Sequence, residues 1–267
     1  MTNTQAPAIV DVGPDIGHDP SASAFRRLLT AVGATIVVHG AAVLALVVSV
    51  VTLFQARRFV VDVIIRRSCQ LILWMAGVDV VIHGSSRWPK TQTVYVFNHT
   101  STLDLFVVCA LGLPNVRFFL KRKFLLFVPM GLLGLLAGTF FTAPQTLPEV
   151  RTRLFQRATR VLQATGESVF LSPEGTRVTT GDIGPFNKGA FHLATALQAP
   201  IVPLFFQTDR RADPGKGLLV GHGTVHVHVL PTIQVSSWST DTVAEHRDAV
   251  HRLFADTRIR LQGTPAP

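Results

Sequence analysis

Residues 93–104 read TVYVFNHTSTLD, a short β-branched and aromatic run that continues directly into a polar cluster. The run over residues 94–97 predicts a strand, and the cluster carries His99 five residues before Asp104. In α/β folds, ligands and catalytic groups gather beyond the carboxyl ends of the strands. The stretch therefore predicts an α/β fold with an imidazole at the edge of its sheet.

The spacing between His99 and Asp104 limits how the two side chains can meet. Residues five apart on a continuous helix point about 140° away from each other. If a turn follows the strand, and Thr100, Ser101 or Thr102 caps the next helix, the carboxylate can curl back. It would then fix the tautomer of the imidazole and leave the other ring nitrogen free as a general base.

A second pair, His251 and Asp256, has the same spacing but lies in a helical pattern, where this geometry forbids contact. Spacing alone is therefore weak evidence. An ordinary loop histidine is the alternative interpretation of His99.

Composition limits the class of protein. The 267 residues allow one sizeable domain with extensions, and a hydrophobic content of 48% with a mean hydropathy of +0.36 is high for a purely soluble fold. A net charge of +9 favours anionic partners such as lipid head groups or phosphorylated substrates. A single tyrosine and no interleaving of aromatic with basic residues disfavour nucleic acid. Cys69 and Cys109 are expected to be buried, reduced thiols.

The first part of the chain predicts membrane association. Residues 1–24 have the composition of a disordered tail, whereas residues 28–54 carry no charge and are long enough to cross a bilayer. Arginines flank both ends of this segment, so the rule that positive charges stay on the cytoplasmic side gives no orientation. A helical hairpin would place both ends on the same side of the membrane. Residues 59–75 predict a helix with one polar stripe, suited to a membrane surface or, alternatively, to a soluble core. We expect residues 25–77 to form membrane-associated helices.

The remainder, residues 78–262, alternates strand and helix patterns. Strands are expected at 78–83, 94–97, 116–120, 168–171, 201–206 and 225–230, and helices at 103–111, 148–164, from 186, and at 241–261. This alternation predicts a largely parallel mixed sheet flanked by helices. The uncharged segment 124–147 predicts either a second membrane-dipping element or the wall of an apolar cavity.

A second polar cluster, Ser172-Pro173-Glu174-Gly175-Thr176-Arg177, follows another expected strand. A glycine turn, the hydroxyl of Thr176 and the guanidinium of Arg177 together predict an anion cradle. Glu174 would repel a phosphate, so we expect it to orient Arg177 or a substrate hydroxyl.

Three histidines, His222, His226 and His228, invite comparison with a metal site. No carboxylate accompanies them, and the latter two alternate with valines, which is typical of a solvated sheet face. We expect no metal.

The two clusters, in this order and each after a strand, resemble the glycerolipid acyltransferase family, which includes the 1-acylglycerol-3-phosphate acyltransferases. The similarity runs roughly from Val78 to Val235. Further family blocks are recognisable at Leu125, Pro129 and Gly131, at Phe186, Lys188 and Gly189, and at residues 199–203.

The resemblance implies that His99, assisted by Asp104, deprotonates an acceptor hydroxyl that attacks an acyl thioester directly. It also implies that Glu174, Gly175 and Arg177 help to bind a glycerol phosphate, and that apolar stretches receive acyl chains. No bound cofactor is implied; acyl-CoA or an acyl-carrier-protein thioester is the co-substrate. Membrane lipids and a lysophospholipid are the implied partners, at the cell membrane with the active domain on its cytoplasmic side.

Three positions depart from the family pattern. Arg122 stands where a lysine is common. Pro144 stands where an arginine is usual, so one phosphate contact is missing, for which Arg122 or Lys123 could substitute. Ser172 replaces a usual phenylalanine. The acceptor could therefore be another lysolipid, such as a lyso-aminolipid.

Two other classes of function stay open: a lipid ester hydrolase that uses the same His–Asp pair, and a non-catalytic membrane-binding module. The choice between the two thioester donors and the preferred chain length do not follow from the sequence.

Overall fold

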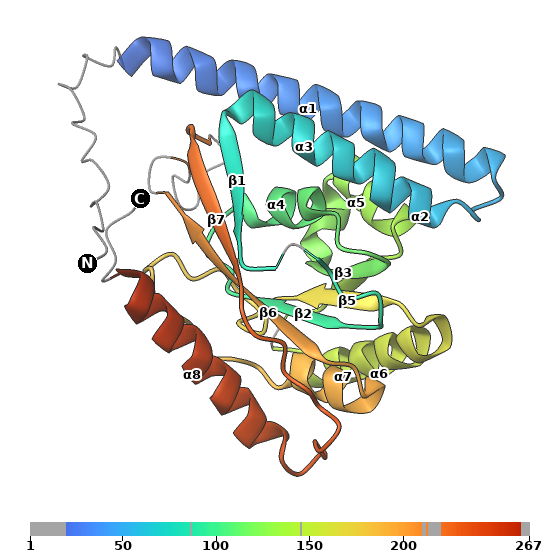
Figure 1. The fold of residues 1–267 in the computed structure, drawn as a ribbon. Coiled ribbons are helices and arrows are strands. Elements are labelled where there is room, and N and C mark those ends of the chain that lie inside the picture. Colours follow the sequence, from blue (N-terminus) through green and yellow to red (C-terminus); the bar gives the residue numbers. More distant parts are fainter. Residues whose placement is uncertain (1–19, 86, 145, 210–211, 213–219, 263–267) are drawn as a thin grey trace, which may run out of the picture.

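Figure 1 shows the fold of the chain, a computed structural model that describes residues 20–85, 87–144, 146–209, 212 and 220–262. The helices are α1 (Pro20–Val51), α2 (Arg57–Phe59), α3 (Arg66–Ala76), α4 (Asp104–Leu111), α5 (Val128–Leu136), α6 (Pro148–Thr165), α7 (Gly189–Leu197) and α8 (Val243–Gln262). A π-helical segment, η1 (Val60–Ile65), joins α2 to α3, and a 3-10 helix, η2 (Arg122–Leu126), precedes α5. The strands are β1 (Val78–His83), β2 (Val94–Phe97), β3 (Val116–Lys121), β4 (Phe140–Thr142), β5 (Ser168–Leu171), β6 (Ile201–Thr208) and β7 (Gly223–Val229).

The described strands form one sheet in the order β1-β7-β6-β2-β5-β3-β4. All neighbouring pairs are parallel except β6 and β7, which confirms the prediction of a largely parallel mixed sheet. Every residue of β2 and of β5 is buried, as both faces of a central parallel strand must be. Because β2, β3 and β5 run in the same direction, the residues that follow them meet at one edge of the sheet.

Helices cover both faces of the sheet (Figure 1). The face carrying Tyr95 and Phe97 packs against α3 and α4, and the opposite face, carrying Val94 and Val96, packs against α6, α7 and α8. A third apolar cluster joins α1 to η1, α3 and α5 outside the first helical layer. The long helix α1 is therefore attached to the domain along one side only.

The N-terminal helices follow the expected order. Residues 1–19 of the predicted tail lie outside the described residues, and α1 already begins at Pro20. The predicted amphipathic helix over 59–75 is present as α2, η1 and α3 in succession, and it ends at Gly77, whose φ of 66° is the left-handed conformation that glycine adopts most easily. Helix α1 and the segment formed by α2, η1 and α3 lie side by side and form the predicted hairpin (Figure 1).

The uncharged segment 124–147 contains a strand that the sequence pattern did not predict. Phe140–Thr142 forms β4, which pairs in parallel with Phe119–Lys121 of β3 at the edge of the sheet. Three residues are too few to show an alternating pattern, and the glycines before them mask the strand signal.

A buried ionic group ties the hairpin to the sheet. Glu167, only 1% exposed, forms ion pairs with Arg57 of α2 and Arg117 of β3. The two guanidinium groups also donate to the carbonyl oxygens of Ala137 (3.2 Å) and Gly138 (3.1 Å) at the end of α5. Losing one partner of such a group would leave a buried charge unpaired.

The histidines of β7 are less solvated than expected. Nδ1 of His226 lies 2.9 Å from Nε2 of His83 on β1, and the rings of His83 and His228 stack with centroids 4.4 Å apart. Burial, followed by the neighbouring positive groups, lowers the pKa of His228 to about 4. The face is thus packed rather than open.

Candidate active site

His99 and Asp104 meet at the carboxyl edge of the sheet. Nδ1 of His99, in the loop after β2, lies 2.7 Å from Oδ2 of Asp104, the first residue of α4. The same carboxylate oxygen accepts the main-chain N–H groups of Thr100 (2.8 Å) and Ser101 (3.0 Å). Since a carboxylate accepts, Nδ1 carries the hydrogen and Nε2 is left with a lone pair for a proton.

The loop closes differently from the expected side-chain cap. No side chain caps the first turn of α4, and the hydroxyl of Ser101 instead accepts the N–H of Leu103 at 2.9 Å. It is Asp104 that reaches back to the amides of the loop. The carboxylate is 1% exposed, whereas the imidazole is 26% exposed. The imidazole of His99 is thus accessible to a ligand, and the carboxylate of Asp104 is shielded from solvent.

Asn98 fixes the loop to the sheet. Its side-chain amide donates to the carbonyl oxygen of Phe206 (2.8 Å) and accepts the N–H of Phe206 (2.7 Å). This pair of bonds continues the ladder between β2 and β6 by one step. Asn98, the residue before His99, is therefore held in register with Phe206 of β6.

Glu174, which the resemblance assigns to substrate binding, accepts hydrogen bonds from main-chain amides of two loops. Its carboxylate is buried, and its oxygens accept the main-chain N–H groups of His99 (2.6 Å) and Gly184 (2.8 Å). Burial raises the pKa of Glu174 to about 7, although these two amides oppose the shift. Both carboxylate oxygens therefore accept main-chain amides, one of which belongs to His99.

The loop around Glu174 is itself fixed. The side chain of Asn187 donates to the carbonyl oxygens of Pro173 (2.9 Å) and Glu174 (3.1 Å). The carbonyl oxygen of His99 accepts the N–H of Val178 at 2.8 Å. The main-chain N–H of His99 is thus hydrogen-bonded to Glu174 in the second polar cluster, and its carbonyl oxygen is hydrogen-bonded to Val178, which directly follows that cluster.

Arg177 brings a guanidinium to the same edge. Its Nη1 donates to Oγ1 of Thr102, which lies between His99 and Asp104, at 2.8 Å. Gly175 has a φ of 68°, and its own N–H donates to the carbonyl oxygen of Ser172 at 3.2 Å. The predicted turn is present, but this amide closes the turn instead of facing a ligand. Thr176 is exposed.

The sequence interpretation missed the cation at the end of β3. Arg122 and Lys123, which it favoured, are both exposed on η2, whereas Lys121 is partly buried. Burial lowers the pKa of the Lys121 ammonium, and the positive charges of Lys123 and Arg177 lower it further. Lys121 is the last residue of β3, which pairs in parallel with β5. Because the ends of parallel strands meet at one edge of the sheet, this position was the signal that could have identified Lys121.

A comparison with protein families matches the part of the chain that contains these residues. The family model described as Acyltransferase matches residues 79–207. Residues 79–207 are an acyltransferase domain. This match confirms the resemblance predicted from the sequence.

Individual relatives of the chain are named 1-acyl-sn-glycerol-3-phosphate acyltransferases. The chain is 33% identical over 172 residues to the human 1-acyl-sn-glycerol-3-phosphate acyltransferase beta, covering 64% of this chain and 62% of that protein. It is 30% identical over 196 residues to the 1-acyl-sn-glycerol-3-phosphate acyltransferase of Saccharomyces cerevisiae, covering 72% and 64%. The matches thus span somewhat less than two thirds of these relatives.

A solved structure shares the fold. The crystal structure of the 1-acyl-sn-glycerophosphate (LPA) acyltransferase PlsC from Thermotoga maritima superposes with a TM-score of 0.75. The sequences are 19% identical, and the superposition covers 92% of this chain and all of the other. The likeness therefore includes the N-terminal helices as well as the acyltransferase domain.

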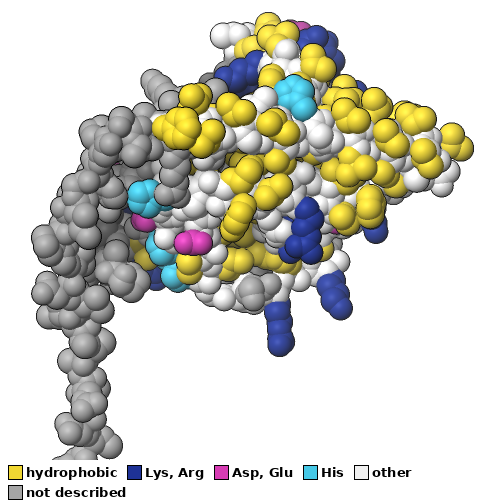
Figure 2. Space-filling model, turned by 90° about the horizontal axis from the view of Figure 1, so that it is seen from above, with side chains coloured by type: hydrophobic (Ala, Val, Ile, Leu, Met, Phe, Trp, Pro, Cys, Tyr) yellow, Lys and Arg dark blue, Asp and Glu magenta, His cyan; other side chains and the backbone are white. Residues whose placement is uncertain are grey.

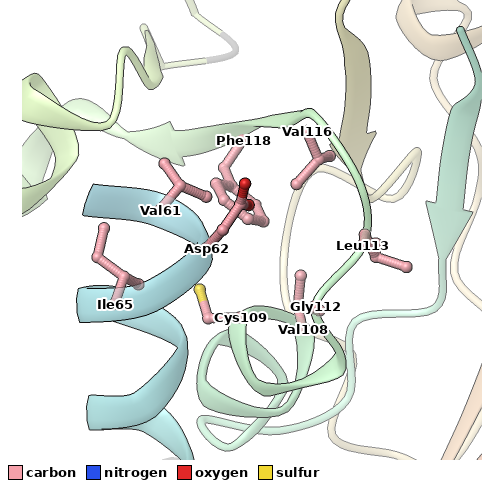
Figure 3. A pocket seen from close by; sticks show the side chains of 9 residues that line it. All are labelled: Val61, Asp62, Ile65, Val108, Cys109, Gly112, Leu113, Val116 and Phe118. Carbon is pink, nitrogen blue, oxygen red and sulfur yellow. The ribbon is translucent and has the colours of Figure 1, made fainter. Parts of the chain in front are cut away.

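An apolar hollow follows the His99–Asp104 pair in the sequence, and its empty space of about 600 Å³ includes space that is open to solvent. It begins at Leu105 and Phe106, directly after Asp104, and continues between α1, α3, α5 and β3. A much narrower pocket, with room for about one water molecule, adjoins it toward the end of α4, and Figure 3 shows the residues that line this pocket. Ile65, Cys109 and Phe118 border both, so the two spaces adjoin.

Among the described residues of the chain, no group of His, Cys, Asp or Glu side chains could hold a metal ion. One helical segment there, Arg27–Val51, is long and apolar enough to cross a membrane, and 22% of its apolar window is buried. Its exposed face includes Ile36, Val43 and Val47. Figure 2 shows hydrophobic side chains spread widely over the face of the molecule seen from above.

Proposed function

We propose that this chain transfers a fatty acyl group from an acyl thioester to the free hydroxyl of 1-acylglycerol-3-phosphate and so forms phosphatidic acid. The observation that carries the proposal is the pairing of His99 with buried Asp104, next to Thr102, to which Arg177 is hydrogen-bonded, and next in the sequence to Leu105, which lines the apolar cavity. The names of the relatives agree with this acceptor.

The reaction needs one general base and no covalent enzyme intermediate. Nε2 of His99 removes the proton of the acceptor hydroxyl as its oxygen attacks the thioester carbonyl carbon. The new C–O bond forms, the C–S bond breaks, and the leaving thiolate takes the proton back from the imidazolium. Asp104 keeps the ring oriented and stabilises its positive charge between the two proton transfers.

The cations at the sheet edge suit a phosphate monoester. Arg177 and Lys121 would hold the acceptor phosphate, with Arg122, Lys123 and the polar groups of Gly175 and Thr176 around them. Glu174 is assigned a positioning role in this proposal.

The cavity suits an acyl chain. Its lining combines side chains such as Leu105, Ile72 and Leu133 with small residues, and it opens one residue after the carboxylate that supports the base. An extended hydrocarbon could therefore enter with its carbonyl near His99. The donor is acyl-CoA or an acyl carrier protein thioester.

The hairpin of α1 and α3 would hold the enzyme on the cell membrane, with the acyltransferase domain on the cytoplasmic side. The exposed face of α1 is apolar, whereas α3 carries Arg67 and Gln70 on its surface. Because the two helices pack side by side, we assign the hairpin to the interfacial layer of the bilayer, where a polar stripe keeps contact with water.

The test is a reconstitution in detergent micelles. Purified protein is mixed with 1-acylglycerol-3-phosphate and either acyl-CoA or acyl carrier protein, and phosphatidic acid and free thiol are measured together. Equal amounts of both products are expected. Thiol release of equal rate without an acceptor would contradict the proposal and identify a hydrolase.

A second acceptor is favoured by one observation. Exposed Pro144 stands where the family pattern has an arginine, which removes one phosphate contact. A lyso-aminolipid is therefore included as a parallel acceptor, and faster turnover of that lipid would reassign the substrate while leaving the chemistry unchanged.

A further inference from the structure

Residues 124–128, referred to below as the turn, comprise the end of η2, Phe127 and the first residue of α5, and they expose an unusual amount of apolar surface. Leu126 is 86% exposed, more than any other large apolar side chain in the described residues, and Val128 is 72% exposed. Phe127 between them is 48% exposed. Exposed apolar groups that adjoin one another mark an interaction surface more often than single ones do.

Main-chain bonds hold this turn in place. The N–H of Phe127 donates to the carbonyl oxygen of Phe124 (3.3 Å), and the carbonyl oxygen of Phe127 accepts the N–H of Gly131 (2.9 Å). Gly131 also lets the backbone approach, because a Cβ there would lie 2.9 Å from Cα of Leu125. The apolar side chains are therefore presented by a fixed turn.

The turn adjoins the exposed face of α1. The ring of Phe127 meets the ring of His39, which is exposed on α1, edge to face with centroids 6.2 Å apart. Behind the turn, Met130 and Leu133 of α5 pack against the α1 cluster. The exposed apolar surfaces of the turn and of α1 are thus continuous.

The charge beside the turn has one sign. Arg122 and Lys123 precede it and are exposed, and no acidic residue stands between Asp104 and Glu149 in the sequence. Apolar side chains flanked by cations match a bilayer surface that contains anionic lipid.

We infer that residues 124–128 insert into an anionic lipid leaflet as a second membrane anchor beside α1. Since η2 continues β3 directly from Lys121, this anchor would hold the cationic edge of the candidate active site close to the head groups. The inference deepens the membrane association in the proposed function but does not depend on acyl transfer.

Depth of insertion is the decisive measurement. In the full chain with Cys69→Ser and Cys109→Ser, Leu126→Cys is labelled with an environment-sensitive fluorophore and mixed with vesicles of phosphatidylcholine and phosphatidylglycerol. A blue shift, and quenching by nitroxides on the lipid acyl chains, are expected. Ile259→Cys, exposed on α8, is the matched control and should show neither. A label at 126 that stays in water while the protein floats with the vesicles would overturn the inference.

Partitioning provides a second readout. Leu126→Asp with Val128→Asp should lower vesicle binding by about tenfold or more, whereas Ile259→Asp should leave it unchanged. Omitting phosphatidylglycerol should weaken binding by about fivefold for each cation engaged. Phosphatidic acid formation by the double variant in micelles should match that of the unaltered chain, which separates a failure of insertion from a failure of the proposed reaction. Equal binding by the double variant and the control would overturn the inference.

Discussion

Oε2 of Glu174 accepts the main-chain N–H of His99 at 2.6 Å, so the second polar cluster of the sequence holds the first through the backbone. The other oxygen holds Gly184 in the same way. One buried carboxylate thus joins two loops that are 75 and 10 residues away from it in the sequence. The main chain of His99 is thus held by a residue that is distant in the sequence.

Replacing Glu174 by Gln should lower kcat about 10–100-fold and leave KM nearly unchanged. The amide must turn one N–H group toward a main-chain donor, which shifts the loop, and small displacements of a catalytic group are costly. Steady-state kinetics in micelles check the result. Glu149→Gln, exposed on α6, is the control, and an equal change in both variants would refute the positioning role.

The same carboxylate predicts a pH dependence of stability. Burial raises the pKa of Glu174 from 4.5 to about 7, so the folded chain retains a proton that the unfolded chain releases between these values. Its contribution to stability is complete below pH 4.5, falls by up to roughly 3 kcal/mol as the pH rises to 7, and is constant above that. Thermal melts should show the difference between the unaltered chain and Glu174→Gln shrinking from pH 5 to 7.5. A difference independent of pH would contradict the assigned shift.

Replacing Asp104 by Asn should lower kcat by roughly 10²–10⁴-fold with the fold intact, because the amide can orient the ring in the wrong tautomer and cannot stabilise the imidazolium. His99→Ala should remove the activity altogether. His251→Ala is the matched control, since His251 has the same spacing to Asp256 but contacts the ring of Phe186 instead. Activity retained by His99→Ala would exclude this residue as the base.

The alternation of strand and helix patterns over residues 78–262 predicted the sheet, and the strand run over 94–97 with the cluster after it predicted that His99 could meet Asp104 if a turn followed the strand. Buried parallel strands have continuous apolar sequences, and strand ends gather at one edge, so this part follows from local pattern. The pattern could not predict β4, which is three residues long and depends on pairing with β3.

Roles that depend on tertiary contacts were less accessible. Nothing near Glu174 in the sequence shows that its oxygens reach two distant amides, and nothing near Lys121 shows that Arg177 comes close. The cap predicted from Thr100, Ser101 or Thr102 was wrong for the same reason, because Asp104 itself satisfies the loop amides.

Lys121 should affect binding more than chemistry. Lys121→Ala is expected to raise KM for 1-acylglycerol-3-phosphate about tenfold with a small change in kcat, since a charged hydrogen bond to phosphate is lost. The salt dependence of KM should decrease at the same time. Lys90→Ala, exposed before β2, is the control. An unchanged KM would place the phosphate elsewhere.

The cavity predicts a change in chain-length preference. Cys109 borders both the larger space and the smaller pocket beyond it, so a phenylalanine there should divide them. Cys109→Phe is expected to reduce kcat/KM for long acyl donors severalfold more than for short ones, with a loss of roughly 1–3 kcal/mol in stability from the extra volume. Cys109→Ser keeps the volume and should retain the original preference. A series of acyl-CoA lengths measured with each variant decides the matter, because a uniform loss across all lengths would mean that the acyl chain does not occupy this cavity.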